Sequence, residues 1–147
     1  MSEDTMEKFQ PKKGFKSALI FNVVLILGVT IYTLFSGNSG SVMAQVNEEA
    51  LGVAGGGVTV FVQVADISEA ELVDTVDFGT PQQEIDEESK VYSGKYENSE
   101  FGVYDLCVYK DSEHYIVVHH SDGVLVYSLK SDKLTQESYE ELVKALE

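Results

Sequence analysis

The chain has 147 residues, of which 44% are hydrophobic and 24% are charged, and its formal net charge is −15. This length allows one modest domain with an appendage. All ten basic residues are lysines, and bidentate phosphate recognition is a property of arginine. The acidity and the lack of arginine exclude nucleic acid as a partner and argue against binding of anionic lipid headgroups. Cys107 is the single cysteine, so the chain is not a secreted scaffold held by internal disulfides.

A transmembrane helix is predicted at residues 17 to 36. The run from Ala18 to Phe35 has 18 residues and no charged side chain, and about 20 apolar residues cross the ~30 Å of bilayer hydrocarbon. Four lysines lie within residues 8 to 16, whereas the next lysine after the run is Lys90. By the positive-inside rule, we expect residues 1 to 16 to be a cytoplasmic tail and the C-terminal part to lie on the outer side of the cell membrane.

A cleaved signal peptide is the alternative interpretation of this segment. Val42, Met43 and Ala44 are small or apolar, as a signal peptidase site requires. The apolar run is longer than the roughly 7 to 15 residues usual for a signal peptide, and the cut would fall within a predicted strand. We therefore favour a retained single-pass anchor.

Residues 37 to 41 are expected to be a short polar linker, and residues 42 to 147 to form one β domain. Residues 42 to 54 are extended with a break near Asn47, Gly55 to Gly57 make a turn, and residues 58 to 64 place valines on one face. This pattern predicts a β-hairpin. Residues 75 to 90 are polar and acidic, so we expect a long loop or a disordered insert there. Further strands are predicted at residues 69–74, 91–97, 102–110, 114–120 and 124–129, the last two joined by a turn at Asp122-Gly123.

One amphipathic helix is predicted at the C-terminus. Tyr139, Leu142, Val143 and Leu146 recur at helical spacing, and Thr135 is the expected N-cap. The predicted fold class is therefore mainly β. Seven antiparallel strands in meander order form a small barrel or sandwich, and the helix packs across one open end.

This order of elements resembles the pleckstrin-homology-like (PH-like) domains of bacterial membrane proteins over residues 42 to 147. The stretches that carry the likeness are residues 58–74, 93–96, 101–104, 114–118, 122–123 and 139–142. The resemblance implies a PH-like fold and a binding or scaffolding module. Family members that act at lipid usually have a basic mouth, whereas this domain has 6 lysines and 22 acids and is expected to face away from the cytoplasm.

The candidate chemical groups do not assemble into a recognisable site in the sequence. His119 and His120 are adjacent on a predicted strand, so their side chains point to opposite faces and cannot readily chelate one ion together; we expect one to be half-buried and the other solvated. Cys107 is expected to be a small buried hydrophobic side chain. Residues 84 to 88 contain four acids, Glu84, Asp86, Glu87 and Glu88. These acids lack the ligand pattern of a calcium loop, so we expect a solvated acidic loop there. We expect no catalytic residue, no metal and no cofactor.

The sequence-based expectation for function is a membrane-anchored binding or scaffolding subunit with a protein partner, and not an enzyme. Phe78, Tyr92 and Tyr96 are aromatic residues amid acids and are the predicted partner contacts, although Tyr92 and Tyr96 could instead pack inward. A secreted or surface-tethered acidic inhibitor or immunity factor is the alternative function. A hydrolase that uses His119 or His120 is a more distant one.

Overall fold

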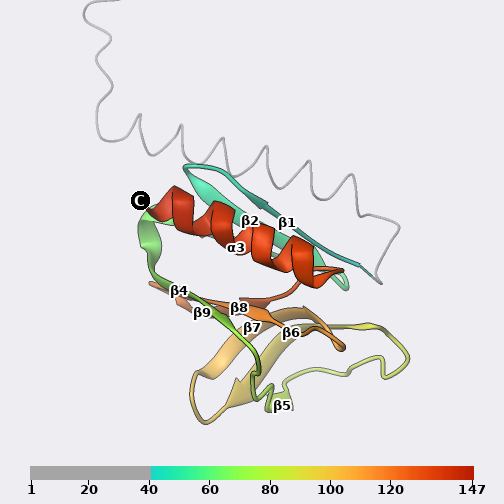
Figure 1. The fold of residues 1–147 in the computed structure, drawn as a ribbon. Helices are drawn as coiled ribbons and strands as arrows, with labels where there is room; N and C mark the ends of the chain where they lie inside the picture. Colours follow the sequence, from blue (N-terminus) through green and yellow to red (C-terminus); the bar gives the residue numbers. More distant parts are fainter. Residues whose placement is uncertain (1–40) are drawn as a thin grey trace, which may run out of the picture.

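The structure is a computed structural model that describes residues 41 to 147. The predicted cytoplasmic tail, the predicted transmembrane helix and most of the predicted linker therefore lie outside the described residues. Among residues 41 to 147, no helix has the length and apolar character needed to span a bilayer. The described part contains two β-sheets and one helix near the C-terminus (Figure 1).

A three-stranded antiparallel sheet is formed by β1 (Val42–Val46), β2 (Ala50–Gly55) and β3 (Val58–Gln63). Asn47 creates the break between β1 and β2, because its side-chain oxygen accepts hydrogen bonds from the backbone N–H groups of Glu49 and Ala50 at 2.7 and 2.8 Å. Asparagine favours such turns because its side chain can take over the role of a backbone carbonyl. The predicted break and the predicted hairpin around the three glycines are both confirmed.

A six-stranded sheet follows, with the spatial order β4-β8-β9-β7-β6-β5. A short 3-10 helix, Val64–Asp66, leads into it from β3. The strands of this six-stranded sheet are β4 (Ile67–Val73), β5 (Thr80–Pro81), β6 (Val91–Asn98), β7 (Gly102–Tyr109), β8 (Tyr115–His120) and β9 (Gly123–Tyr127).

The predicted seven-stranded antiparallel meander is wrong in two respects. The described residues contain nine strands, because the first predicted extended segment divides into β1 and β2, and because β5 forms within the predicted loop. The order is also not a meander, since β9 lies between β7 and β8 and pairs in parallel with β7. The buried runs Tyr115–Val118 and Leu125–Tyr127 explain this position: strands that are apolar on both faces are suited to the centre of a sheet.

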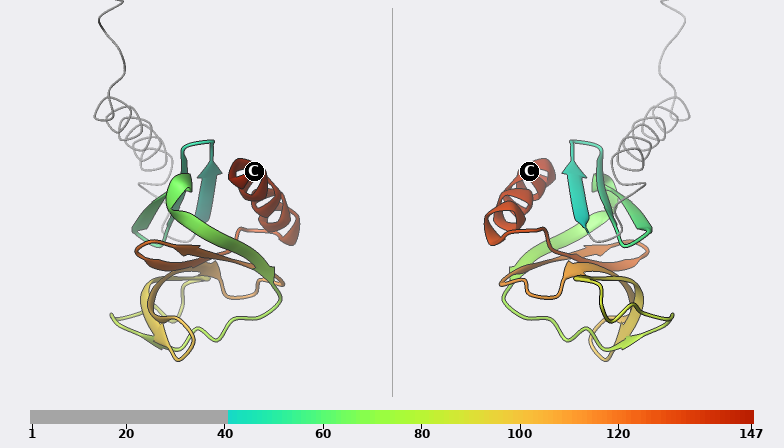
Figure 2. Two further views of the ribbon diagram at one scale, coloured as in Figure 1. Left: turned by 90° about the vertical axis from the view of Figure 1, so that its left-hand side faces the viewer. Right: turned by 90° about the vertical axis from the view of Figure 1, so that its right-hand side faces the viewer.

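Helix α3 (Asp132–Leu146) and the three-stranded sheet lie side by side over one face of the six-stranded sheet (Figure 2). The main hydrophobic core lies between these three parts. It includes four fully buried residues, Leu51, Ile116, Leu125 and Leu142. The predicted helix is confirmed, but its predicted N-cap is wrong. Ser131 is the N-cap and accepts a hydrogen bond from the backbone N–H of Leu134.

Thr135 instead lies within the first turns of α3 and is buried. Its hydroxyl accepts a hydrogen bond from the backbone N–H of Leu129 at 3.0 Å and donates one to the backbone carbonyl of Ser131, also at 3.0 Å. Both serine and threonine suit an N-cap, so local sequence does not distinguish them. The contact with Leu129 shows that Thr135 joins the helix to the end of the sheet.

A second hydrophobic core covers the opposite face of the six-stranded sheet, which we call the outer face. Its buried members include Tyr96, Tyr104, Leu106, Tyr115 and Val126. The segment predicted as a loop or disordered insert lies below the sheet in Figure 1, and its residues Val76 and Phe78 pack against this core. Two of its residues form β5, an edge strand that pairs with β6. Pro81 has no backbone N–H, and an edge strand tolerates proline because one side of it has no partner strand.

Candidate functional site

The structure brings the three predicted partner contacts together on the outer face. The ring centroid of Phe78 lies 5.9 Å from that of Tyr92, and the centroid of Tyr92 lies 6.2 Å from that of Tyr96. Tyr96 is only 3% exposed and belongs to the second core. Phe78 and Tyr92 are half-buried beside it. Of the three, only Phe78 and Tyr92 therefore present an accessible ring surface.

Phe78 also has a structural task, which the sequence pattern did not indicate. Its ring packs edge-on against Tyr115 with a centroid separation of 5.6 Å, and its backbone carbonyl accepts a hydrogen bond from the hydroxyl of Tyr104 at 2.8 Å. These two contacts attach the segment before β5 to the sheet. A substitution of Phe78 would therefore disturb the second core as well as any partner contact.

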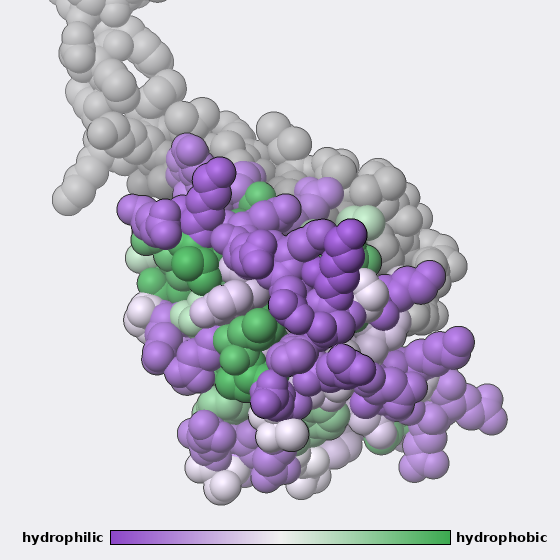
Figure 3. Space-filling view, in the orientation of Figure 1, coloured by the Kyte–Doolittle hydropathy of each residue, from purple (hydrophilic) through white to green (hydrophobic). Residues whose placement is uncertain are grey.

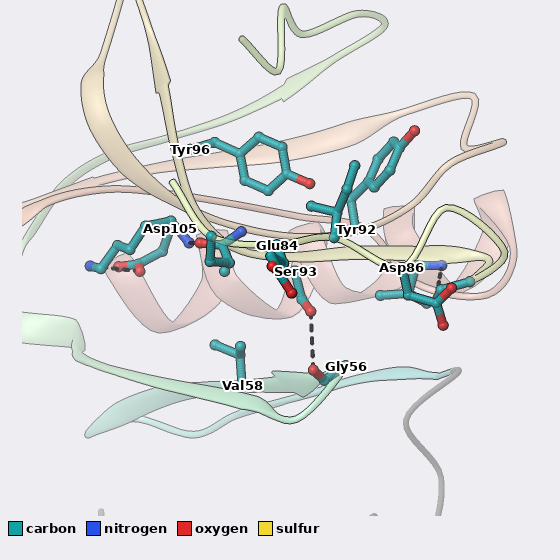
Figure 4. Close-up of a pocket in the computed structure, with 14 residues that line it drawn as sticks. Gly56, Val58, Glu84, Asp86, Tyr92, Ser93, Tyr96 and Asp105 are labelled. Carbon is teal, nitrogen blue, oxygen red and sulfur yellow. Dashed lines mark hydrogen bonds and ion pairs between the residues drawn. The ribbon is translucent and has the colours of Figure 1, made fainter. Parts of the chain in front are cut away.

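A groove lies beside β6 and is the candidate binding site. It has a volume of about 460 Å³. One wall is the β2–β3 turn and another is the acidic segment after β5 (Figure 4). We call it the β6 groove and define it by its lining residues Gly56, Val58, 83–86, Ser89, 91–96 and Asp105.

The acidic wall of the β6 groove is held in place by backbone hydrogen bonds. The N–H of Gln82 donates to the carbonyl of Lys95 at 2.9 Å, and the N–H of Lys95 donates to the side-chain oxygen of Gln83 at 3.0 Å. Further along, the carboxylate of Asp86 accepts from the N–H of Glu88 at 3.0 Å. Extension of β5 by a glutamine side chain thus positions residues 83 to 86 over β6.

The β6 groove carries more negative than positive charge. Glu84, Asp86 and Asp105 line it, whereas Lys95 is the one lysine among its lining residues. The ammonium group of Lys95 lies 2.8 Å from a carboxylate oxygen of Asp105, so these two charges compensate each other. The remaining carboxylates, Glu84 and Asp86, are exposed, as is the neighbouring apolar side chain of Ile85, which is 37% exposed.

The hydroxyl of Tyr96 is the unusual polar group of this site. It is buried and has no hydrogen-bond partner within residues 41 to 147, although Tyr96 lines the groove. Burial, and to a smaller extent Tyr92, raises the pKa of Tyr96, so the hydroxyl keeps its proton at neutral pH. A buried hydroxyl without a partner is unfavourable for the folded protein by roughly 1–3 kcal/mol. Its oxygen is not exposed, so it is an unsatisfied polar group of the second core and not a contact for a ligand.

Neither the predicted histidine pair nor the cysteine forms a catalytic arrangement in the described residues. His119 contacts the edge of the Phe101 ring, while His120 accepts a hydrogen bond from the backbone N–H of Asp122. Both histidines are half-buried, so the expectation that one is solvated is wrong. Cys107 is 1% exposed as expected, and burial together with Asp105 raises the pKa of its thiol to about 12. A protonated, buried thiol is a poor nucleophile.

The sequence offered no signal for two walls of the β6 groove. Gly56 belongs to the turn between β2 and β3, and its carbonyl accepts a hydrogen bond from the hydroxyl of Ser93 at 3.3 Å (Figure 4). Gln83 belongs to the segment after β5 and approaches Gly94 closely. The first contact depends on the packing of the two sheets, and the second depends on the pairing of β5 with β6.

Comparison with known proteins adds no assignment to this description. No protein-family model matches the chain. Neither a curated protein nor a solved structure shows significant similarity to it.

Proposed function

We propose that this chain is a single-pass membrane protein whose extracytoplasmic, PH-like domain is a non-enzymatic binding module for a protein partner. The β6 groove receives a lysine-bearing segment of that partner. The observation that carries this proposal is the pair of exposed carboxylates, Glu84 and Asp86, which line one groove without an ion pair to a lysine of the described residues. These carboxylates supply charge complementarity for a lysine side chain.

The charge of the whole domain supports a basic partner. Residues 42 to 147 contain 6 lysines and 22 acids, and the face drawn in Figure 3 is mostly hydrophilic. A field of this sign accelerates the approach of positively charged segments and repels acidic ones. It also opposes binding to anionic lipid, in agreement with the predicted orientation away from the cytoplasm.

The anchor and the groove have separate roles in this proposal. The predicted helix at residues 17 to 36 retains the domain at the membrane, and the linker at residues 37 to 41 holds it near the bilayer surface. A partner in the same membrane is then present at a high effective concentration, which allows a modest groove to be sufficient for assembly.

The proposal is tested by affinity purification of the full-length chain from gently solubilised membranes. The test variant combines Glu84→Gln with Asp86→Asn, which removes two negative charges from the groove. The amide oxygen introduced at position 86 can still accept the hydrogen bond from the backbone N–H of Glu88. The control combines Glu140→Gln with Glu141→Gln on α3, which removes the same charge at exposed positions outside the groove. We expect the test variant to lose the partner and the control to retain it. Equal capture by both would contradict a role for the groove.

Tyr96→Phe provides a second control, because it removes only a buried hydroxyl that the groove does not expose. We expect unchanged partner capture and no loss of thermal stability, since the hydroxyl is buried and has no partner within the described residues. Added salt should weaken capture by the parent chain. An intact mass that corresponds to a chain cut near residue 44 would instead favour the secreted inhibitor or immunity factor.

A further inference from the structure

A second group of potential ligands lies at the opposite edge of the six-stranded sheet from the β6 groove. Glu69 and Glu71 are two residues apart on the edge strand β4, so their side chains leave the same face. Glu69 is paired directly with His119 of β8. One ligand atom from each of these three residues lies within 4.8 Å of the other two.

The contacts around His119 fix its position relative to β4. The hydroxyl of Ser68 donates a hydrogen bond to the backbone carbonyl of His119 at 3.2 Å. The ring of Phe101 lies edge-on to the imidazole with a centroid separation of 5.9 Å. The register of β4 against β8 shifts between Ile67 and Glu69, and such bulges redirect side chains at sheet edges. The imidazole is thus oriented without using its ring nitrogens.

The two carboxylates of this group lack a compensating lysine. No lysine of the described part of the chain forms an ion pair with Glu69 or Glu71. A carboxylate oxygen of Glu69 lies within 4.8 Å of one of Glu71. Two carboxylates held this close are stabilised by a shared proton or by a bound cation. The imidazole beside them favours the cation.

We propose that Glu69, Glu71 and His119 bind one divalent transition-metal ion of the zinc class. Imidazole suits such ions, whereas calcium and magnesium prefer an all-oxygen set. Three protein ligands leave a further position for water or for a ligand atom from a partner. The ion would join the edge strand β4 to β8, because its ligands come from both strands.

The other histidine–carboxylate group shows why the ligand set alone is not sufficient. Glu113, His114 and Asp132 also lie within 4.8 Å of one another. Both ring nitrogens of His114 are already engaged, however, one by Asp132 and the other by Asp74. An imidazole that donates from both nitrogens has no lone pair for a metal. His119, by contrast, has no carboxylate ion pair of this kind within residues 41 to 147.

This inference departs from the sequence-based expectation of no metal. For His119, that expectation considered chelation together with His120, whose side chain leaves the opposite face of β8. The missing ligands lie on β4, about 50 residues earlier in the chain. The alternation Glu69-Ala70-Glu71 is visible in the sequence, but the pairing of β4 with β8 is not.

The test uses the full-length chain in detergent, freed of metal and titrated separately with Co²⁺ and Zn²⁺. We expect one equivalent of Co²⁺ to bind with a visible absorption change, and Zn²⁺ to displace it. His119→Ala and the pair Glu69→Gln with Glu71→Gln should each weaken binding by about tenfold or more.

Two matched variants control this experiment. His120→Ala removes the neighbouring imidazole from the opposite face, and His114→Ala removes the one in the other carboxylate group. Both should bind Co²⁺ as the parent does. Thermal melts without metal identify any variant that fails to fold. If His119→Ala does not fold, the variant with Glu69→Gln and Glu71→Gln still tests the proposal, because glutamine has nearly the same shape as glutamate. Unsaturable binding by the parent, or loss of binding in His114→Ala but not in His119→Ala, would overturn the proposal.

Discussion

The Nε2 atom of His114 lies 3.1 Å from Oδ1 of Asp74. Asp74 follows the end of β4, and His114 directly precedes β8. The other ring nitrogen, Nδ1, contacts the carboxylate of Asp132, the first residue of α3. One imidazole thereby connects the end of the edge strand, the start of a central strand and the N-terminus of the helix.

This connection predicts a pH-dependent contribution to stability. The hydrogen bond with Asp132 raises the pKa of His114 above its ordinary value of 6.5, although desolvation opposes the increase and Asp74 and Glu113 add to it. The same hydrogen bond lowers the pKa of Asp132 below 3.8. Stabilisation by His114 is complete below pH 6.5 and is lost as the pH rises through the raised pKa. Stabilisation by Asp132 is present above pH 3.8 and is lost as the pH falls through the lowered pKa.

We therefore expect the difference in Tm between the parent and His114→Gln to be largest between pH 3.8 and pH 6.5. It should decrease as the pH rises beyond this window. Thermal melts in a series of buffers measure the difference. A constant difference across the series would mean that the imidazole stabilises the fold by packing and not by its charge.

Gly79 should be intolerant of a side chain, because a Cβ atom there would lie 1.9 Å from the backbone carbonyl oxygen of Glu97. Gly102 is the matched control, since its φ of +70° is close to the +76° of Gly79 and it has no atom within 4 Å of an added Cβ. Gly102→Ala should destabilise by roughly 1–2 kcal/mol from backbone strain alone. Gly79→Ala should lower the free energy of unfolding, measured with urea, considerably more than Gly102→Ala does. Equal losses in the two variants would contradict the close approach of the segment before β5 to β6.

Leu142 anchors α3 in the main core and is 0% exposed. Leu142→Ala should reduce the free energy of unfolding by about 2–5 kcal/mol, because it removes buried methyl groups and leaves a cavity. Glu140→Ala, at an exposed position two residues earlier, should change it by less than about 0.5 kcal/mol. Urea unfolding followed by circular dichroism compares the two variants, and a small loss for Leu142→Ala would place the helix away from the sheets.

Cys107 should be unreactive in the folded protein. Its thiol has a pKa of about 12 because of burial and of Asp105, and its sulfur contacts the carbonyl of Gly55 at 3.8 Å. At pH 8 we expect a thiol reagent to modify the chain only at the rate of unfolding, and rapidly in concentrated urea. Rapid modification without urea would show that β7 separates transiently from the three-stranded sheet and exposes the thiol.

The sequence predicted most elements because their patterns are local. Alternating valines identified β3, and the spacing of Tyr139 and Leu142 identified α3. Strand partners are not local, so the continuous apolar runs of β8 and β9 predicted two strands without indicating that β9 enters between β7 and β8. The two-residue strand β5 has no periodicity from which it could be recognised, and it forms because β6 offers a free edge.

The candidate sites were predictable only in part, for the same reason. Phe78 and Tyr92 were visible as aromatic residues amid acids, but the carbonyl contact of Phe78 with Tyr104 requires the completed outer face. The approach of Gln83 to Gly94 and the pairing of Glu69 with His119 depend on tertiary register. Spacing along the chain carries no information about either contact.

The central position of β9 also determines when the domain can be completed. Before residues 123 to 127 leave the ribosome, β7 and β8 each retain one unpaired edge, because β9 is the strand that pairs with both. Unpaired edges of this kind recruit strands from other chains. A chain truncated before Gly123 would therefore aggregate rather than fold into a smaller domain, because β9 completes the six-stranded sheet.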